Sequence, residues 1–171
     1  MKQLVLGAFC VFVLLSKPVW AQTPQISATP PSPAQPQNTM ITQMGTDGTY
    51  EVDAKQAKIS DSILTLVLSY RNTSPNLIKI TPYKVDEVYY IDGKEQKKYH
   101  VLKDEKGEWI ASPVARGMIA VEETIAASGL EIPQAGQKMV WFKFPAPPAT
   151  TNEININIPG ILPFEKVPVS R

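Results

Sequence analysis

The stretch ILTLVLSY at residues 63–70 decides the fold class of this chain. Leucine or tyrosine occupies every second position from 64 to 70, and the positions between them are mostly aliphatic or small. Alternation with a period of two is typical of a β-strand, and apolar residues on both faces indicate a strand in the middle of a sheet. The run Asn-Thr-Ser-Pro-Asn at 72–76 then predicts a loop rich in turns.

Strand patterns of the same kind recur on both sides of this stretch. Residues 138–144 place three large apolar side chains on one face and Trp141 on the other. In residues 153–158, isoleucine alternates with asparagine. Residues 164–169 fit only an edge strand, because proline cannot donate a hydrogen bond within a sheet. Shorter or weaker strand patterns occupy residues 50–59, 77–80, 86–91, 97–102 and 108–111.

Short strands separated by turns predict an all-β protein, an antiparallel β-sandwich of about seven strands. Residues 86–111 predict a three-stranded meander whose first turn is Asp92-Gly93, because glycine readily adopts the positive φ of a tight hairpin. Residues 113–128 are ambiguous. Within them, residues 118–127 fit a strand, but a short helix or an irregular loop fits slightly better.

The later patterns follow one another in a distinctive order. The strand at 64–72 ends on an asparagine turn, and residues 99–107 form the next strand and turn. The sequence VWFKFPAPP at 140–148 and Ile-Pro-Gly at 158–160 then precede a final strand. Over roughly residues 50–169, this order resembles the immunoglobulin-like domains of exported bacterial envelope proteins. The resemblance implies an immunoglobulin-like sandwich and no catalytic residue.

The N-terminus predicts export from a bacterial cell. A lysine at position 2 precedes twelve apolar residues, Leu4 to Leu15, and Val-Trp-Ala then leads to a cleavage site between Ala21 and Gln22. This arrangement is typical of a secretory signal peptide. Twelve residues span about 18 Å of helix, which is too short to anchor the chain across roughly 30 Å of hydrocarbon.

The rest of the chain divides into a linker and one domain. Residues 1–21 form the predicted signal peptide, and residues 22–46 a proline-rich, disordered linker. Five of the seventeen residues at 22–38 are proline and most others are small or polar, so this segment has little apolar surface to bury. Residues 47–171 form the predicted β-sandwich domain.

Composition excludes several classes of function. The chain has 17 basic and 16 acidic residues, which gives no electrostatic reason to bind nucleic acid or an anionic membrane. Its single cysteine and single histidine exclude a disulfide scaffold, a zinc finger and Cys-His catalysis. Cleavage after Ala21 removes two lysines and the cysteine, leaving a thiol-free protein with a net charge of −1.

No arrangement of residues in the sequence predicts catalysis. His100 lies in the predicted strand at 97–102, close to Lys97 and Lys98, and is expected to be a solvated strand residue. The adjacent carboxylates Asp86-Glu87 and Asp104-Glu105 point to opposite sides of a strand or belong to a turn. We therefore expect a protein that is not an enzyme and that holds neither a metal nor a cofactor.

Aromatic residues supply the one indication of binding. Tyrosine and tryptophan are enriched at interfaces, and several of them lie on the meander together with basic residues. By simple alternation, half of these aromatic side chains are expected to fill the core instead. The candidate binding residues are Tyr90, Tyr99, Trp109 and, beside the meander, Arg116.

We therefore expect a non-enzymatic exported β-sandwich that acts as an interaction or accessory module in the bacterial cell envelope. Its location would be the periplasm, with secretion as the alternative, and its partner an unidentified protein or envelope component. It would bind no nucleic acid and would not span the membrane. The alternative is a binder of a small ligand or envelope polymer, in a cleft beside residues 113–128 that Trp109, Tyr99 and Arg116 would line.

Overall fold

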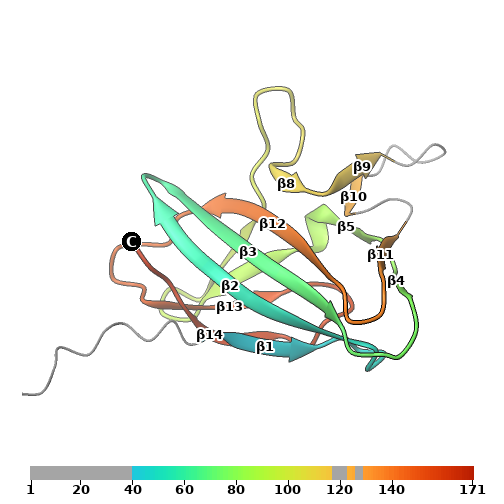
Figure 1. Ribbon diagram of the computed structural model, residues 1–171. Coiled ribbons are helices and arrows are strands. Elements are labelled where there is room, and N and C mark those ends of the chain that lie inside the picture. The colour runs from blue at the N-terminus through green and yellow to red at the C-terminus, as the bar shows by residue number, and fades with distance from the viewer. Residues whose placement is uncertain (1–39, 117–122, 126–128) are drawn as a thin grey trace, which may run out of the picture. The chain divides into compact units, whose positions relative to one another are not determined.

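A computed structural model describes residues 40–116, 123–125 and 129–171 (Figure 1). The predicted signal peptide, the cleavage site at Ala21 and Gln22, and most of the predicted linker lie outside these residues. The described residues form fourteen strands and one short 3-10 turn, which confirms the all-β prediction. Within the same residues, no helix is long and apolar enough to cross a membrane.

Two large antiparallel sheets contain most of the strands. The five-stranded sheet has the order β1-β2-β3-β12-β8, and the four-stranded sheet has the order β14-β13-β6-β7. In Figure 1 the four-stranded sheet lies behind the five-stranded one. The bounds are β1 Ile41–Met44, β2 Tyr50–Ser60, β3 Ile63–Asn72, β6 Tyr89–Asp92, β7 Lys97–His100, β8 Ala111–Ser112, β12 Gln137–Pro145, β13 Glu153–Asn157 and β14 Phe164–Pro168.

Two small sheets complete the described structure at one end of the sandwich. One has the order β5-β10-β9 and the other pairs β11 with β4. The 3-10 turn, Val85–Glu87, follows β5 directly. The bounds are β4 Ile78–Ile80, β5 Tyr83–Lys84, β9 Val114–Arg116, β10 Glu123–Ile125 and β11 Leu130–Ile132.

The strand at 63–70 is central, as its sequence predicts. β3 pairs with β2 on one side and with β12 on the other, and Leu66 lies opposite Phe142. Both side chains are completely buried. Neighbouring positions on the opposite face, such as Val67 and Trp141, are only partly buried. The core therefore lies between the two large sheets, where the period-two pattern places its largest apolar residues.

The folded domain begins earlier than predicted. Residues 41–44, which the sequence analysis assigned to the linker, form β1 and pair with the first half of β2. A bulge at Lys55 interrupts β2, and beyond it Ser170 bonds to Ala57 and Ile59 through backbone groups. Both ends of the domain therefore share the outer edge of one strand. The sequence Ile-Thr-Gln-Met is too short for its alternation to be distinctive.

The predicted meander is two strands rather than three. β6 and β7 form a hairpin, but the predicted third strand at 108–111 does not continue it. Residues 108–110 turn back on residues 102–104, and Ala111 begins β8, which pairs with β12 in the other sheet. The start at residue 86 is also wrong, because residues 85–87 form the 3-10 turn. In the hairpin turn Gln96, not Gly93, has a positive φ, of 53°. The turn depends on the Asp92 side chain, which accepts hydrogen bonds from the backbone N–H groups of Lys94 and Glu95.

The ambiguous segment contains a strand where it is described. Residues 123–125 form β10, so the preference for a short helix or loop over 118–127 is wrong for these three residues. β10 pairs with β9 and β5, and Ile125 is buried. Pairing with two neighbours decides the conformation here, which local sequence cannot reveal. The rest of 118–127 lies outside the described residues.

Candidate functional site

The β6–β7 hairpin directs its aromatic side chains to two different sides. Tyr90 and Tyr99 lie opposite each other and face the core, whereas Tyr89 and His100 form the neighbouring pair on the other face. Tyr90 is completely buried, while Tyr89 and Tyr99 are partly buried. Alternation along the strands separates the predicted contact residues into core and surface groups.

Tyr90 is a core residue, and this corrects its assignment to a contact surface. Its ring stacks on Tyr99, with centroids 4.7 Å apart, and meets the edge of Phe144. Its hydroxyl donates to the carbonyl oxygen of Pro145 over 2.8 Å. Burial raises the pKa of the Tyr90 hydroxyl well above its ordinary value. Tyr90 therefore joins the two large sheets through packing and one hydrogen bond.

The hairpin is fixed from within by a buried carboxylate. Asp92 is fully buried and accepts a 2.6 Å hydrogen bond from the hydroxyl of Thr151. Burial acts to raise the pKa of Asp92, but hydrogen bonds from Thr151 and from two backbone N–H groups outweigh burial and lower it. A carboxylate that accepts three bonds inside the fold stabilises the turn and is not available to a substrate.

Three lysines of this region lie over aromatic rings. The ammonium nitrogen of Lys98 is 3.5 Å from the ring centre of Tyr89. The corresponding distances are 5.0 Å for Lys97 over Tyr99 and 4.1 Å for Lys103 over Trp109. Such cation–π pairs occur about once per 70–80 residues in proteins, so three within residues 89–109 are unusually dense.

These lysines have no acidic partner among the described residues. None of the three ammonium groups has a carboxylate within salt-bridge distance there. We call the surface formed by the β6–β7 hairpin and residues 101–110 the open edge. It includes Tyr99 and Trp109 and is joined to β12, because Lys143 bonds to Leu102 and Ile110 through its backbone.

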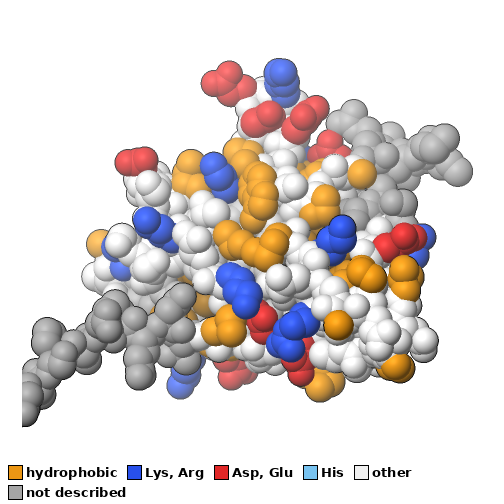
Figure 2. Space-filling model, in the orientation of Figure 1, with side chains coloured by type: hydrophobic (Ala, Val, Ile, Leu, Met, Phe, Trp, Pro, Cys, Tyr) orange, Lys and Arg blue, Asp and Glu red, His pale blue; other side chains and the backbone are white. Residues whose placement is uncertain are grey.

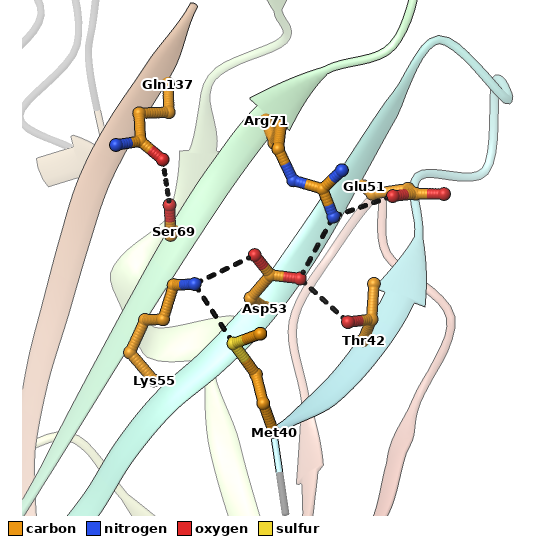
Figure 3. Close-up of polar contacts among 8 residues, drawn as sticks. All are labelled: Met40, Thr42, Glu51, Asp53, Lys55, Ser69, Arg71 and Gln137. Carbon is orange, nitrogen blue, oxygen red and sulfur yellow. Dashed lines mark hydrogen bonds and ion pairs between the residues drawn. The ribbon is translucent and has the colours of Figure 1, made fainter.

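On the outer face of β2 and β3, by contrast, two basic residues are paired with acids (Figure 3). Arg71 lies 2.8 Å from a carboxylate oxygen of Glu51 and 3.3 Å from one of Asp53. Lys55 lies 3.2 Å from the other oxygen of Asp53. Thr42 on β1 donates a 2.7 Å bond to the oxygen that Arg71 approaches. This cluster balances two bases against two acids and ties β1 to its sheet.

The outer face of the five-stranded sheet also carries apolar side chains. Figure 2 shows hydrophobic groups across the middle of this face, among lysine and arginine side chains. Trp141 lies beside Val67 in the register, and both are partly buried. Met139, on the same face of β12, is 49% exposed. Trp141 thus faces away from the core, as the sequence predicts.

A hollow beside β10 is the feature closest to the predicted cleft. It has a volume of about 440 Å³. The residues predicted to line a cleft are not among those that form it. Arg116 lies on β9 opposite Glu123, and its side chain is outside the described part of the structure. The lining residues are Thr81, Pro82, Tyr83, Lys84, Glu87, Thr124, Pro159 and Gly160.

The remaining polar groups show structural contacts. Nδ1 of His100 lies 3.1 Å from the carbonyl oxygen of Asp86, at the surface. Tyr70 and Tyr83 share a buried 2.7 Å hydrogen bond between their hydroxyls, and burial raises the pKa of both. Among the described residues, no three histidine, cysteine or acidic side chains are grouped as metal ligands would be.

Comparison with known proteins adds little to this geometry. No family model and no curated protein matches the chain. Among solved structures it is similar to MPT63, a secreted protein from Mycobacterium tuberculosis, with 13% sequence identity and a TM-score of 0.39. The match covers 74% of this chain and 92% of MPT63. A similarity of this size carries no argument about function, and the immunoglobulin-like topology stays a prediction.

Proposed function

We propose that the protein is a non-enzymatic interaction module of the bacterial cell envelope and that it binds a partner protein through the open edge. The observation that carries the proposal is the set of three lysines held over aromatic rings without an acidic partner in the described residues. The export pattern of residues 1–21 supports a location outside the cytoplasm.

The lysine side chains of this surface are partly ordered before a partner binds. A free lysine side chain loses rotamer entropy when a partner immobilises it, and this loss opposes association. A lysine whose ammonium group already contacts an aromatic ring has lost part of its rotamer entropy in the unbound protein. Tyrosine and tryptophan also supply the large apolar contacts typical of interface hot spots. The open edge combines both kinds of group around Tyr99 and Trp109.

The electrostatics of the fold support binding rather than catalysis. Catalytic groups have strongly perturbed pKa values and remain accessible to substrate. Here the carboxylates with a lowered pKa are Asp53 and Asp92, and both are buried and hydrogen-bonded within the fold. Tyr70 and Tyr83, whose pKa values are raised, bond to each other in the core. Each perturbation has a structural partner that explains it.

Single substitutions at matched aromatic positions test the proposal. The exported full-length chain serves as bait for envelope extracts, and its variants are Trp109→Ala and, as control, Trp141→Ala. Both tryptophans are partly buried, but only Trp109 lies on the open edge. Trp109 also packs against the core, so we expect Trp109→Ala to melt below the native protein. At a temperature where both are folded, it should recover less partner. Loss of recovery with Trp141→Ala alone would place the interface on the five-stranded sheet and contradict the proposal.

The hollow beside β10 supports a second candidate, the binding of a small ligand or an envelope polymer. Its volume of about 440 Å³ lies within the range of small-molecule sites, and its lining mixes hydroxyl, charged and proline side chains. Thr124→Trp would fill it from β10, which lies within residues 113–128. Loss of binding to envelope polysaccharide in this variant, with native binding in Trp109→Ala, would favour this candidate over the open edge.

A further inference from the structure

The open edge ends in a strand with one free side. β7 is the last strand of the four-stranded sheet and pairs only with β6 among the described strands. In an antiparallel pair, every second residue directs its backbone N–H and C=O away from the partner strand. The outer side of β7 therefore presents backbone donors and acceptors on which another strand can pair.

The charge along this strand is one-sided. Lys97 and Lys98 are exposed, and His100 at its end is exposed as well. Among the described residues, no carboxylate lies within salt-bridge distance of Lys97 or Lys98, and Asp92 is buried against Thr151. Other exposed acids lie before and after the strand: Glu95, Asp104, Glu105 and Glu108. An incoming strand with carboxylates would find cations on both of its faces, because Lys97 and Lys98 point to opposite sides.

We infer that the partner contributes an extended acidic segment that adds to β7 as a further antiparallel or parallel strand. This inference rests on the proposed function, since it names how the same edge binds. Backbone hydrogen bonds would supply affinity that does not depend on sequence, and the lysines would select aspartate or glutamate. The aromatic rings of Tyr89 and Tyr99 would hold these lysines in place while they pair.

The opposing explanation is that the lysines only protect the edge. Lysines on edge strands commonly prevent unwanted pairing between sheets, and β7 fits that description. The two explanations differ in what the lysines do to an acidic strand. Protection predicts that neutral variants self-associate and that acidic peptides are ignored. If the lysines instead attract an acidic strand, the native protein should bind acidic peptides, and variants with neutral residues at these positions should not bind them.

A labelled peptide with pairs of adjacent glutamates between valines is the probe, because adjacent residues of a strand place carboxylates on both faces. Fluorescence anisotropy with the full-length exported chain is the measurement. Two companion peptides complete the set, one with lysine in place of glutamate and one N-methylated at every backbone amide, so that neither edge keeps a donor. We expect the acidic peptide alone to bind. In the double variant Lys97→Gln with Lys98→Gln, the affinity for the acidic peptide should fall by about tenfold or more, because two charge-assisted contacts are lost.

The matched control is Lys58→Gln with Lys138→Gln, which removes the same charge from two exposed lysines away from β7. This control should bind the acidic peptide with native affinity. Equal weakening in both double variants would mean a general charge effect and would overturn the inference. Native binding of the N-methylated peptide would overturn strand addition, because that peptide lacks the donors that pairing needs.

Self-association of the Lys97→Gln, Lys98→Gln variant, with no peptide binding by the native protein, would show protection and also overturn the inference. The proposed function has its own outcome. If envelope partners are still recovered through Trp109 but the acidic peptide does not compete with them, the edge binds by another mode and only the inference fails. If recovery is independent of Trp109 and Tyr99, the proposed function itself fails.

Discussion

The two edges of the sandwich differ in how they end. At one edge, β1 and the C-terminal residues cover β2, and backbone bonds join Met44 to Leu162 and Thr46 to Gly160 across the two large sheets. We call this the sealed edge. Its buried carboxylate, Asp53, is paired with Arg71 and Lys55. The open edge ends instead in β7, with lysines paired only to aromatic rings among the described residues.

The contrast separates groups that hold the fold from groups available to a partner. Carboxylates and bases that satisfy each other between strands stabilise the structure and have little left to offer a ligand. Cations without a counter-ion retain most of their capacity to bind an anion. The sealed edge should therefore respond to substitution through stability, and the open edge through binding. The predictions below test this division, beginning with the core that both edges share.

Emptying the shared core should have the largest effect. Phe142 and Leu66 are completely buried and lie opposite each other in the register. Phe142→Ala or Leu66→Ala should each lower the free energy of unfolding by about 2–5 kcal/mol, through lost burial and the cavity left behind. Urea denaturation measures this free energy. Trp141→Ala, on the opposite face of the sheet, should lower it clearly less. A loss below about half a kilocalorie at both core positions would contradict the register.

Removing the charge of Asp53 tests the sealed edge. The side chain is 2% exposed and bonds to groups on β1, β2 and β3. Asp53→Asn should cost about 1–3 kcal/mol, because it leaves buried partners imperfectly satisfied. Glu51→Gln is the matched control: it removes a more exposed carboxylate from the same arginine and should cost less than about 1 kcal/mol. Both variants should bind partners normally.

The same carboxylate gives the edge a pH dependence of known sign. Burial acts to raise the pKa of Asp53, but hydrogen bonds from Thr42, Arg71 and Lys55 outweigh it and lower the pKa below its usual value. A lowered pKa contributes stability above the unfolded value, near 3.9, that disappears as the pH falls through the folded value. The difference in melting temperature between native protein and Asp53→Asn should therefore be large at neutral pH and shrink below about pH 4. A difference that grows in acid would contradict this assignment.

A single hydroxyl tests how firmly the sealed edge joins the two sheets. Tyr50 on β2 donates a 2.6 Å hydrogen bond to the carbonyl oxygen of Gly160, which precedes β14. Tyr50→Phe keeps the ring, which stacks on Tyr70, and removes only this bond. We expect a loss of about 0.5–1.5 kcal/mol in urea denaturation. An unchanged midpoint would show that the backbone bonds alone hold the edge.

The sequence predicted those parts of the fold in which local pattern and tertiary environment agree. In β3 and β12, period-two alternation alone specifies which face is buried, and Leu66 and Phe142 are buried as predicted. β1 and β10 were not predicted because each is too short for a distinctive alternation, and β10 also pairs with β5, about forty residues earlier in the chain. The third strand of the meander was misplaced for a related reason, since sequence does not reveal that β8 changes sheets.

The candidate site was predictable in region but not in detail. Composition directed attention to the hairpin, yet it could not assign Tyr90 to the core and Tyr89 to the other face without the register. The pairing of Lys103 with Trp109 depends on a turn that brings residues six apart together. One pattern in the sequence could have indicated the lysine–ring pairs. Lys98 and Tyr89 face the same side of adjacent strands once the hairpin register is assumed.

The smallest expected effect is the coupling between Lys98 and Tyr89 on the open edge. The ammonium lies 3.5 Å from the ring centre, and an exposed cation–π contact contributes about 0.5–1 kcal/mol. Lys98→Gln, Tyr89→Leu and the double variant form a cycle that isolates this contribution from other effects of each change. We expect a coupling in that range for unfolding, together with weaker binding of the acidic peptide in both single variants. The binding loss in Tyr89→Leu is the decisive result, because that variant keeps the lysine charge and removes only the ring that orders it. Native peptide binding by Tyr89→Leu would show that the charge acts without being ordered, and the difference between the two edges would then reduce to charge pairing alone.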